Sequence, residues 1–489
     1  MKKCTKKAVS ILAAISCLFS GSVVGFTQGS LPELHLIAAA AAYQEDGLQL
    51  DYQVLSDGTI EITKFIQSDA TDITLPAVID GVEVTSIGED AFKGCKEITS
   101  ITIPDGVTTI KEWAFADCEA LKSIVIPDSV TTIEGWAFSR CKALLSVVIP
   151  SRLTTIENGT FIYCKALTSV TIPDSVASIG IYAFNDCSSL TSVIIPAGTT
   201  SVDVGAFSYC DKLTEIAVAS DSPYYTSVDG VLFNKDMTEL VCYPKGKQET
   251  TYEIPDSVIT IKKEAFINCN LTSIGIPNSV TTIEECAFQC CTSLESITIP
   301  KSVKKVDDWM FRNCTSLKSV TISEGVTTVE GYAFYNCSSL TDITIPASVT
   351  SIGVQAFQNC TSLTDITIKN GSCKIDDLQT VPSTTITIHG YAGSTAETYA
   401  NHRNEKFVPL SVETQQMGDP NGDGVVSVED AVLTLTIYAQ KSAGLTVDCS
   451  EAQLAAADID GDGNISVEDA IAILTYYAKQ SAGLNPTWD

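Results

Sequence analysis

The sequence predicts a β-rich solenoid made of short parallel strands, followed by a small all-α domain. Three observations predict it. Phenylalanine and cysteine recur every 23 residues through the middle of the chain, each period has the apolar alternation of a short strand, and a twelve-residue acidic loop occurs twice near the C-terminus. The expected segments are a leader over 1–42, an N-terminal cap over 43–81, repeats over 82–369 with a variant unit at about 211–254, a C-terminal cap over 370–412 and the helical domain over 413–489.

The composition excludes several classes of protein. Of the 489 residues, 45% are hydrophobic and 18% are charged, which is too apolar for a disordered acidic chain. The formal net charge of -29 makes an electropositive nucleic-acid groove improbable, so no nucleic-acid partner is expected. With only three histidines, a histidine-rich zinc or iron site is not expected either.

The N-terminus has the pattern of a signal peptide. Lys2, Lys3, Lys6 and Lys7 precede an apolar stretch over 8–19, which is too short to span a bilayer as a stable helix. Three alanines end at Ala42 and offer a cleavage site before Tyr43, with cleavage near Gly25 as the alternative. We therefore expect a secreted, extracellular protein that does not insert into a membrane.

The N-terminal cap and the repeats follow the leader. Asp57-Gly58 predicts a hairpin turn inside the cap. The unit over 164–184 shows the repeat well: Leu167, Val170 and Ile172 suit a short strand that Pro173 ends, and a second extended piece follows over 176–179. An Ala-Phe pair then packs inward from the opposite wall. One unit cannot bury its apolar face alone, so the units must stack.

Eleven cysteines occupy one repeat position, beginning with Cys95, Cys118 and Cys141. Secretion favours disulfides, and adjacent turns of the solenoid fall within disulfide distance. The alternative, which we favour, is a buried stack of free thiols that act as small apolar side chains.

Two outward-facing columns are candidate binding faces. One is the nearly uncharged sheet face of serine and threonine, as at Ser169 and Thr171, which could also simply suit a flat sheet. The other lies two positions before the core phenylalanine, where charged residues and glycine also occur, so it is expected to be exposed. Exposed aromatic side chains there would be available for ligands, but packing over the neighbouring turn is the alternative that we favour. The candidate ligand residues of this aromatic column are Trp113, Trp136, Tyr182, Trp309 and Tyr332.

The repeats resemble the BspA-like family of bacterial leucine-rich repeats over about residues 45–410. The variant unit contains the segment over 224–233 followed by Tyr243-Pro244, and His389-Gly390 opens the segment that resembles the family's C-terminal cap. The resemblance implies a leucine-rich-repeat solenoid. In its C-terminal cap, 395–401 is expected to be a short helix.

The two acidic loops match the ligand spacing of EF-hand calcium loops. Each has oxygen-bearing side chains at positions 1, 3, 5 and 12 and glycine at position 6; position 7 would donate a backbone carbonyl and position 9 a serine hydroxyl, directly or through water. Calcium prefers such oxygen ligands, so two calcium ions are expected. The expected ligands are Asp419, Asn421, Asp423, Val425, Ser427 and Asp430 in the first loop and Asp458, Asp460, Asp462, Asn464, Ser466 and Asp469 in the second.

The paired loops and their helical continuations resemble a type I dockerin over about residues 417–489. Position 12 is aspartate rather than the glutamate of signalling EF-hands, and the loops are 39 residues apart, which implies an enlarged linker over about 446–456. The resemblance implies a cohesin module of a scaffoldin as partner, in a cellulosome-type assembly for polysaccharide catabolism. It places cohesin recognition at Val428 and Glu429 of the first half and Val467 and Glu468 of the second.

The predicted function is a non-catalytic binding or adhesion subunit, whose repeats hold a protein or glycan target. The alternatives are an inhibitor or regulator of other complex members, and a cryptic glycoside hydrolase. The sequence contains no P-loop, G-x-S-x-G or H-E-x-x-H motif, and caps, repeats and loops account for the chain after the leader, so no enzyme is expected.

Overall fold

The computed structural model describes residues 41–376, 386–410, 416–447, 449–484 and 486–488. The predicted leader lies outside these residues except for Ala41 and Ala42, which begin the first strand, β1. Within the described residues, no helix combines the length and the apolar character that a membrane span requires.

The N-terminal cap is an antiparallel sheet that leads into the parallel array. Its strands β2 and β3 are joined at Asp57-Gly58, where Val54 pairs with Ile60, so the predicted hairpin is confirmed. The strands of the cap are β1 (Ala41–Glu45), β2 (Leu48–Val54), β3 (Ile60–Gln67), β4 (Asp72–Thr74), β5 (Val78–Ile79) and β6 (Val82–Ile87). Because β3 and β6 are parallel, the cap passes directly into the register of the repeats.

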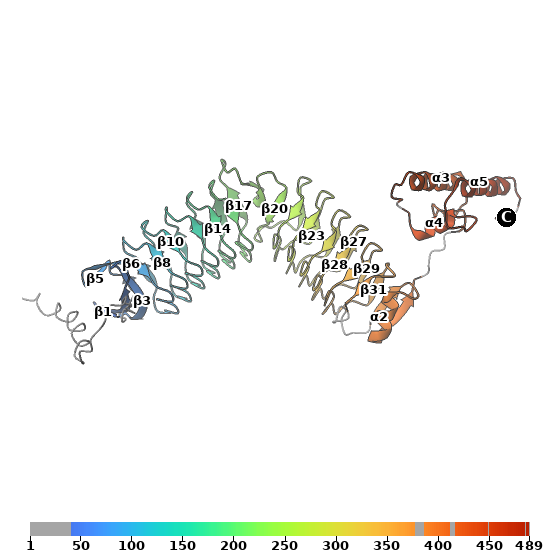
Figure 1. The fold of residues 1–489 in the computed structure, drawn as a ribbon. Coiled ribbons are helices and arrows are strands. Elements are labelled where there is room, and N and C mark those ends of the chain that lie inside the picture. Colours follow the sequence, from blue (N-terminus) through green and yellow to red (C-terminus); the bar gives the residue numbers. More distant parts are fainter. Residues whose placement is uncertain (1–40, 377–385, 411–415, 448, 485, 489) are drawn as a thin grey trace, which may run out of the picture. The chain divides into compact units, whose positions relative to one another are not determined.

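Each repeat contributes two short parallel strands (Figure 1). The register advances by one repeat from strand to strand, as where Ser146 pairs with Ser169. The longer strands are β7 (Ser100–Thr102), β9 (Ser123–Val125), β11 (Ser146–Val148), β13 (Ser169–Thr171), β15 (Ser192–Ile195), β17 (Glu215–Val218), β21 (Thr251–Glu253), β23 (Ser273–Gly275), β25 (Ser296–Ile299), β27 (Ser319–Ile322), β29 (Asp342–Ile345) and β31 (Asp365–Ile368). The shorter strands are β8 (Thr109–Ile110), β10 (Thr132–Ile133), β12 (Thr155–Ile156), β14 (Ser178–Ile179), β16 (Ser201–Val202), β22 (Thr260–Ile261), β24 (Thr282–Ile283), β26 (Lys305–Val306), β28 (Thr328–Val329), β30 (Ser351–Ile352) and β32 (Lys374–Ile375). The four-residue strand β20 (Glu239–Cys242) of the variant unit pairs in parallel with β22.

The core of the array is a column of stacked phenylalanine rings. Phe115 and Phe138 have ring centroids 5.3 Å apart and planes that differ by 1°, and this arrangement repeats along both halves of the array. The backbone of the same wall is also bonded between turns, since Phe115 N donates to Ala137 O at 2.8 Å. Ring stacking and backbone pairing therefore fix the same spacing, which explains the constant period of the sequence.

None of the sixteen described cysteines is in a disulfide, which confirms the favoured alternative for the repeat column. The thiols do more than fill space. Cys164 Sγ donates to Phe138 O at 3.2 Å, and the equivalent bond to the phenylalanine of the preceding turn recurs in both halves, as at Cys141 and Cys337. Burial raises the pKa of Cys164 to about 12, so the thiol keeps the proton that it donates.

Two positions of every turn have left-handed backbone. One is the aromatic column, where φ is 58° at Trp113, 54° at Trp136 and 57° at Tyr182. The other precedes the repeat cysteine, as at Asp117 and Asn313. A left-handed residue other than glycine costs about 1–2 kcal/mol. The glycines, aspartates and asparagines found at these positions therefore report backbone conformation rather than solvent exposure.

The variant unit joins two separate cores. Its strands β18 (Tyr225–Val228) and β19 (Val231–Asn234) form an antiparallel hairpin, and β19 also pairs with β20. Leu232 packs into the N-terminal core, whereas its neighbours Val231 and Phe233 pack into the C-terminal one. The extra residues of this unit thus interrupt the regular stack without leaving its ends uncovered.

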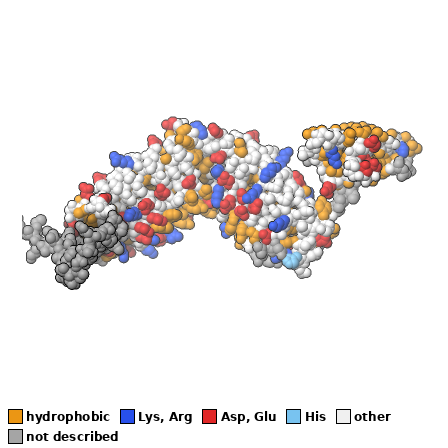
Figure 2. All heavy atoms as spheres, in the orientation of Figure 1, with side chains coloured by type: hydrophobic (Ala, Val, Ile, Leu, Met, Phe, Trp, Pro, Cys, Tyr) orange, Lys and Arg blue, Asp and Glu red, His pale blue; other side chains and the backbone are white. Residues whose placement is uncertain are grey.

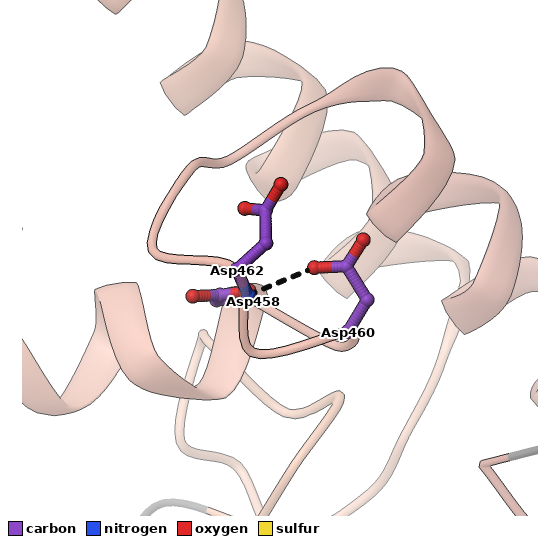
Figure 3. Close-up of side chains that lie close together, drawn as sticks. All are labelled: Asp458, Asp460 and Asp462. Atoms are coloured by element: carbon purple, nitrogen blue, oxygen red, sulfur yellow. Dashed lines mark hydrogen bonds between the residues drawn. The ribbon is translucent and has the colours of Figure 1, made fainter.

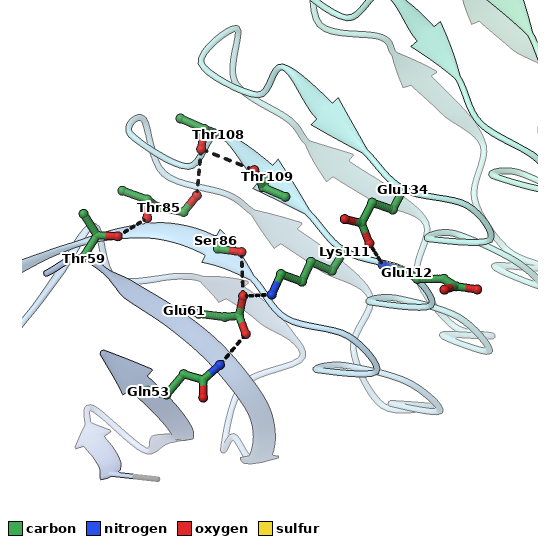
Figure 4. A network of polar contacts seen from close by, with 10 residues as sticks. All are labelled: Gln53, Thr59, Glu61, Thr85, Ser86, Thr108, Thr109, Lys111, Glu112 and Glu134. Carbon is green, nitrogen blue, oxygen red and sulfur yellow. Dashed lines mark hydrogen bonds and ion pairs between the residues drawn. The ribbon is translucent and has the colours of Figure 1, made fainter. Parts of the chain in front are cut away.

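A buried glutamate ties the N-terminal cap to the first turns of the array (Figure 4). Glu61 is 3% exposed, and it forms an ion pair with Lys111. Gln53 Nε2 donates to Glu61 Oε1 at 2.8 Å, and Ser86 Oγ donates to Oε2 at 3.0 Å. The network joins strands that are distant in the sequence, so it fixes where the array begins.

The C-terminal cap pairs β33 (Thr387–Gly390) with β34 (Lys406–Pro409) and contains the helix α2 (Thr395–Arg403), as predicted. The remaining helices are α3 (Val428–Ser442), α4 (Glu451–Ala457) and α5 (Val467–Ser481). The enlarged linker expected over 446–456 therefore contains most of a helix, α4, whose N-cap residue Ser450 accepts a hydrogen bond from Gln453 N.

Candidate functional site

The second acidic loop gathers three carboxylates. Oxygens of Asp458, Asp460 and Asp462 lie within 4.8 Å of one another (Figure 3). Asp458 Oδ1 is buried and has no hydrogen-bond partner. A buried carboxylate oxygen without a donor is costly, and a bound divalent cation would satisfy it. The residues present therefore fit a hard cation.

The first loop has the same sequence spacing but a different arrangement of its leading carboxylate. Asp419 is 3% exposed, and its two oxygens accept hydrogen bonds from Gly422 N at 2.8 Å and Gly424 N at 2.9 Å. Asp423 Oδ1 accepts from Val425 N at 2.9 Å. These bonds hold the loop closed around the predicted ligand side chains.

The predicted ligands at position 12 also begin the helices. Asp430 and Asp469 are both buried, and each accepts bonds from the backbone and hydroxyl of the serine at position 9, as from Ser466 N at 2.8 Å. The other oxygen of Asp469 accepts from Ile459 N at 2.8 Å. A glutamate would place its carboxylate one carbon farther away, so aspartate suits this short connection between loop and helix.

The helices α3 and α5 carry matching exposed apolar faces, which Figure 2 shows as a hydrophobic band along this domain. Val428 is 42% exposed and its counterpart Val467 39%; Val432 is 57% exposed and its counterpart Ile471 56%. Leu435 and Leu474 are also exposed and extend the two stripes by about one further helical turn. The predicted recognition residues Glu429 and Glu468 are exposed beside them.

Trp488 packs against Gly418 at the start of the first loop, a contact that the sequence analysis missed. The rings of Trp488 and Tyr476 stack with centroids 4.0 Å apart. A Cβ on Gly418 would lie 2.1 Å from the Trp488 ring, so only glycine fits there. The available signal was a tryptophan with no counterpart after the first helix.

The aromatic column forms stacked pairs rather than a continuous ligand face. Trp113 stacks on Trp136 with centroids 5.4 Å apart, and Trp309 stacks on Tyr332 at 4.4 Å. These four side chains are half-buried, whereas Tyr182 is exposed. The expectation of exposure was wrong for these four side chains, because the glycines and charged residues of the column reflect the left-handed backbone. Their stacking agrees with the favoured alternative of packing over the neighbouring turn.

The serine and threonine columns of the longer strands are exposed over most of the array, as at Ser169 and Thr171. Apolar residues interrupt the hydroxyls at Val125, Val148 and Ile194, which are all more than half exposed. The sheet face is therefore accessible, as predicted, and of mixed polarity.

A cavity of about 390 Å³ opens where the variant unit interrupts the stack. Its walls include Tyr182, Tyr209, Lys263, Glu264, Glu285 and Trp309. Tyr182 and Glu264 lie on opposite sides of the variant unit and are 82 residues apart, yet the Tyr182 hydroxyl donates to Glu264 Oε1 at 3.0 Å. Figure 2 shows basic and acidic side chains gathered together over this middle part of the array. The sequence analysis missed the cavity, because it depends on how an irregular unit packs.

The fold and these surfaces define a solenoid of leucine-rich repeats followed by a helical domain with paired acidic loops. The chain belongs to the family with BspA-type leucine-rich repeat regions, whose model matches residues 58–188, 154–237, 241–364 and 327–389. The match confirms the resemblance seen in the repeats. It ends before the acidic loops.

Solved structures agree with this assignment. A leucine-rich cell surface protein of Faecalibacterium prausnitzii is 34% identical with a TM-score of 0.58, and the alignment covers 67% of this chain and 94% of that one. The pneumococcal vaccine antigen PcpA is 18% identical with a TM-score of 0.57, over 76% of this chain and 99% of that one, and shares the fold. No protein with a curated description matches the sequence.

Proposed function

We propose that this protein is a secreted, non-catalytic binding subunit that docks on a scaffoldin cohesin through its C-terminal domain and presents its repeats to a protein or glycan target. The observation that carries the docking part is the duplicated apolar stripe on α3 and α5. Each stripe begins at the first residue of its helix, Val428 or Val467, which is position 10 of the acidic loop. Exposed apolar side chains in such a regular arrangement are typical of a protein interface.

Calcium is the ion proposed for both loops. The orphaned Asp458 Oδ1 and the neighbouring Asp460 and Asp462 support a cation in the second loop, and the matching sequence spacing extends the proposal to the first. A bound ion would neutralise carboxylates that otherwise repel one another at the start of each helix. It would thereby hold α3 and α5 in the arrangement that presents their stripes.

The duplication supports two alternative modes of docking. Positions 39 residues apart carry identical or similar side chains, as Val428 with Val467 and Val432 with Ile471. Since both helices offer equivalent residues, a cohesin could contact mainly one stripe or, after a half-turn, the other. The two halves should then be partly redundant.

The proposal for the repeats is binding or adhesion at the outer surface of a bacterium. It is supported by the family membership and by the relative from F. prausnitzii, whose description is that of a cell surface protein. The array has an accessible hydroxyl-bearing sheet face and stacked aromatic pairs, which suit contact with a partner. A screen of the array on plant polysaccharides, with product analysis, separates binding from hydrolysis.

The docking experiment uses aspartate substitutions on each stripe. Val428→Asp with Val432→Asp disrupts the first stripe, and Val467→Asp with Ile471→Asp disrupts the second. Against a panel of type I cohesin modules, each two-residue variant should lose less than about fivefold in affinity, and the four-residue variant should lose more than about 100-fold.

The control is Glu451→Lys on α4, which changes a charge outside both stripes and should leave the affinity unchanged. Thermal unfolding would establish that each variant keeps its fold. Wild-type protein that binds no cohesin, or that buries the stripes by forming dimers, would contradict the proposed docking.

A further inference from the structure

The cavity beside the variant unit contains a buried carboxylate that has no cationic partner. Glu264 is 9% exposed, and it accepts hydrogen bonds from the Tyr182 hydroxyl at 3.0 Å and from Ser208 Oγ at 3.1 Å. Across the described residues, no lysine, arginine or histidine nitrogen lies within 4.0 Å of its oxygens. Two hydroxyl donors leave part of the carboxylate's bonding capacity unused, and an uncompensated buried charge is unfavourable.

The basic groups of the cavity are already engaged elsewhere. Lys263 Nζ pairs with Glu285 at 2.8 Å, which raises the pKa of Lys263. The Arg312 guanidinium lies over the ring of Trp309, 4.1 Å from its centroid, and 5.7 Å from that of Tyr335. Among the described residues that line the cavity, Lys263 and Arg312 would have to leave these contacts to pair with Glu264.

The geometry around Glu264 is built rather than incidental. The residue has φ of 59°, a left-handed conformation that is costly for glutamate. On the turn before the variant unit, a Cβ at Gly205 would lie 2.3 Å from the Tyr182 ring and 2.7 Å from Glu264 Oε2, so glycine is required for the two side chains to meet. The left-handed backbone recurs at this repeat position along the array. The contact that joins Tyr182 and Glu264 beside Gly205 is therefore the feature that distinguishes this place.

Aromatic rings complete the environment of the carboxylate. Tyr182 and Tyr209 line the same cavity, and Tyr182 is 37% exposed. Burial, with the Glu264 charge as the second cause, raises the pKa of Tyr182 to about 12, so its hydroxyl remains a donor at neutral pH. A carboxylate among phenol rings attracts an ammonium or guanidinium group through charge and through the ring faces.

We infer that this cavity binds a lysine or arginine side chain of a protein partner, with Glu264 as the counter-ion and the tyrosine rings as walls. The volume of about 390 Å³ accommodates such a side chain together with adjacent backbone. The net charge of -29 would favour the approach of a basic segment. The inference rests on the proposed binding role of the array and names the chemistry of one contact.

The test compares three short peptides on the full chain by calorimetry at low salt. The probes are acetyl-Gly-Lys-Gly-amide, the same peptide with norleucine in place of lysine, and the same peptide with acetylated lysine. The lysine peptide should bind with a Kd of about 1 mM and at least tenfold more tightly than either uncharged peptide. Salt should weaken its binding and leave that of the others unchanged.

The variant Glu264→Gln keeps the size of the side chain and should reduce the affinity for the lysine peptide at least tenfold. Asp90→Asn is the matched control, because Asp90 occupies the same repeat position with the same left-handed backbone but pairs with Lys93. If Glu264→Gln fails to fold, Tyr182→Leu keeps the carboxylate and removes a ring, and it should reduce the affinity about fivefold.

Absence of lysine-peptide binding at about 20 mM, or equal affinity for the lysine and norleucine peptides, would overturn the inference. A Glu264→Gln protein that is folded and binds normally would do the same. The cohesin experiment does not involve this cavity, so its outcome is independent of these results.

Discussion

At the residue scale, the repeat cysteines show what a recurring residue type does and does not reveal. Their regular spacing was enough to predict a buried column of free thiols. The hydrogen bond from Cys164 Sγ to Phe138 O could not be predicted, because it depends on how far one turn is displaced from the next. The same limit applies to the aromatic column, where glycine and aspartate were interpreted as exposure but mark left-handed backbone.

The thiols predict that the array loses stability in alkali. Burial raises the pKa of Cys141, Cys164 and Cys187, so at high pH the folded chain retains protons that the unfolded chain releases. Stability should be fully present below about pH 8.5, the pKa of an unfolded cysteine, and should fall as the pH rises above it, by about 1.4 kcal/mol per pH unit for each such thiol. Urea unfolding from pH 7 to pH 10 measures this.

A variant provides the control for that experiment. Cys164→Ala removes one titrating thiol, so its stability should fall less steeply with pH than that of the wild type, although it starts lower because a donor and buried volume are lost. Equal slopes in the two proteins would contradict the assignment of the alkaline loss to these cysteines.

At the element scale, the strands and caps followed closely from the sequence, since proline, the Asp57-Gly58 turn and apolar alternation act locally. The contacts between elements could not be predicted from the sequence in the same way. Glu61 is a charged residue inside a strand of the cap, and only the packed structure brings it to Lys111 and Ser86. The variant unit was likewise visible in the sequence as an insertion between regular repeats. Its role in joining two cores depends on the hairpin that it forms, which only the structure shows.

From the Glu61 network we predict that the stability of the N-terminal cap depends on Lys111. Lys111→Met preserves much of the side-chain length but leaves a buried carboxylate without its cation, which should cost about 2–4 kcal/mol. Hydrogen exchange of β2 and β3 during urea unfolding measures the loss locally. Adding Glu61→Gln should recover part of it, because the unpaired charge is then removed.

The matched control is Lys142→Met, since the pair of Lys142 with Glu119 is exposed on both sides. Its loss should cost about 0.5 kcal/mol or less. If the two substitutions have similar effects, the Glu61 network does not fix the start of the array.

At the scale of the whole molecule, the array and the helical domain have different sources of stability. The array is stabilised by stacked phenylalanine rings and by two continuous apolar cores that contain most of its buried residues. The helical domain has two small clusters, one around Val426 and Ile473 and the other around Ile437 and Ile465, and many carboxylates beside them. So few buried side chains make the domain the part whose folding would depend most on a bound ion.

Removal of calcium should therefore unfold α3 and α5 and leave the array intact. With excess chelator, the amides of the two helices should lose protection from hydrogen exchange while those of β11 and β25 keep it, and binding to a cohesin panel should be lost. Returning calcium should restore both, and magnesium should not, because it favours a smaller site and gives up its water less readily. At a free concentration 100 times its Kd, each ion would stabilise the domain by about 2.7 kcal/mol, comparable with the total that so small a core provides.

Asp460→Ala with Asp462→Ala should reproduce the loss in the second half even with calcium present, since it removes two of the three gathered carboxylates. Protected helices and unchanged cohesin binding in chelator would mean that the two clusters suffice alone, and the acidic loops would then be turns rather than ion sites.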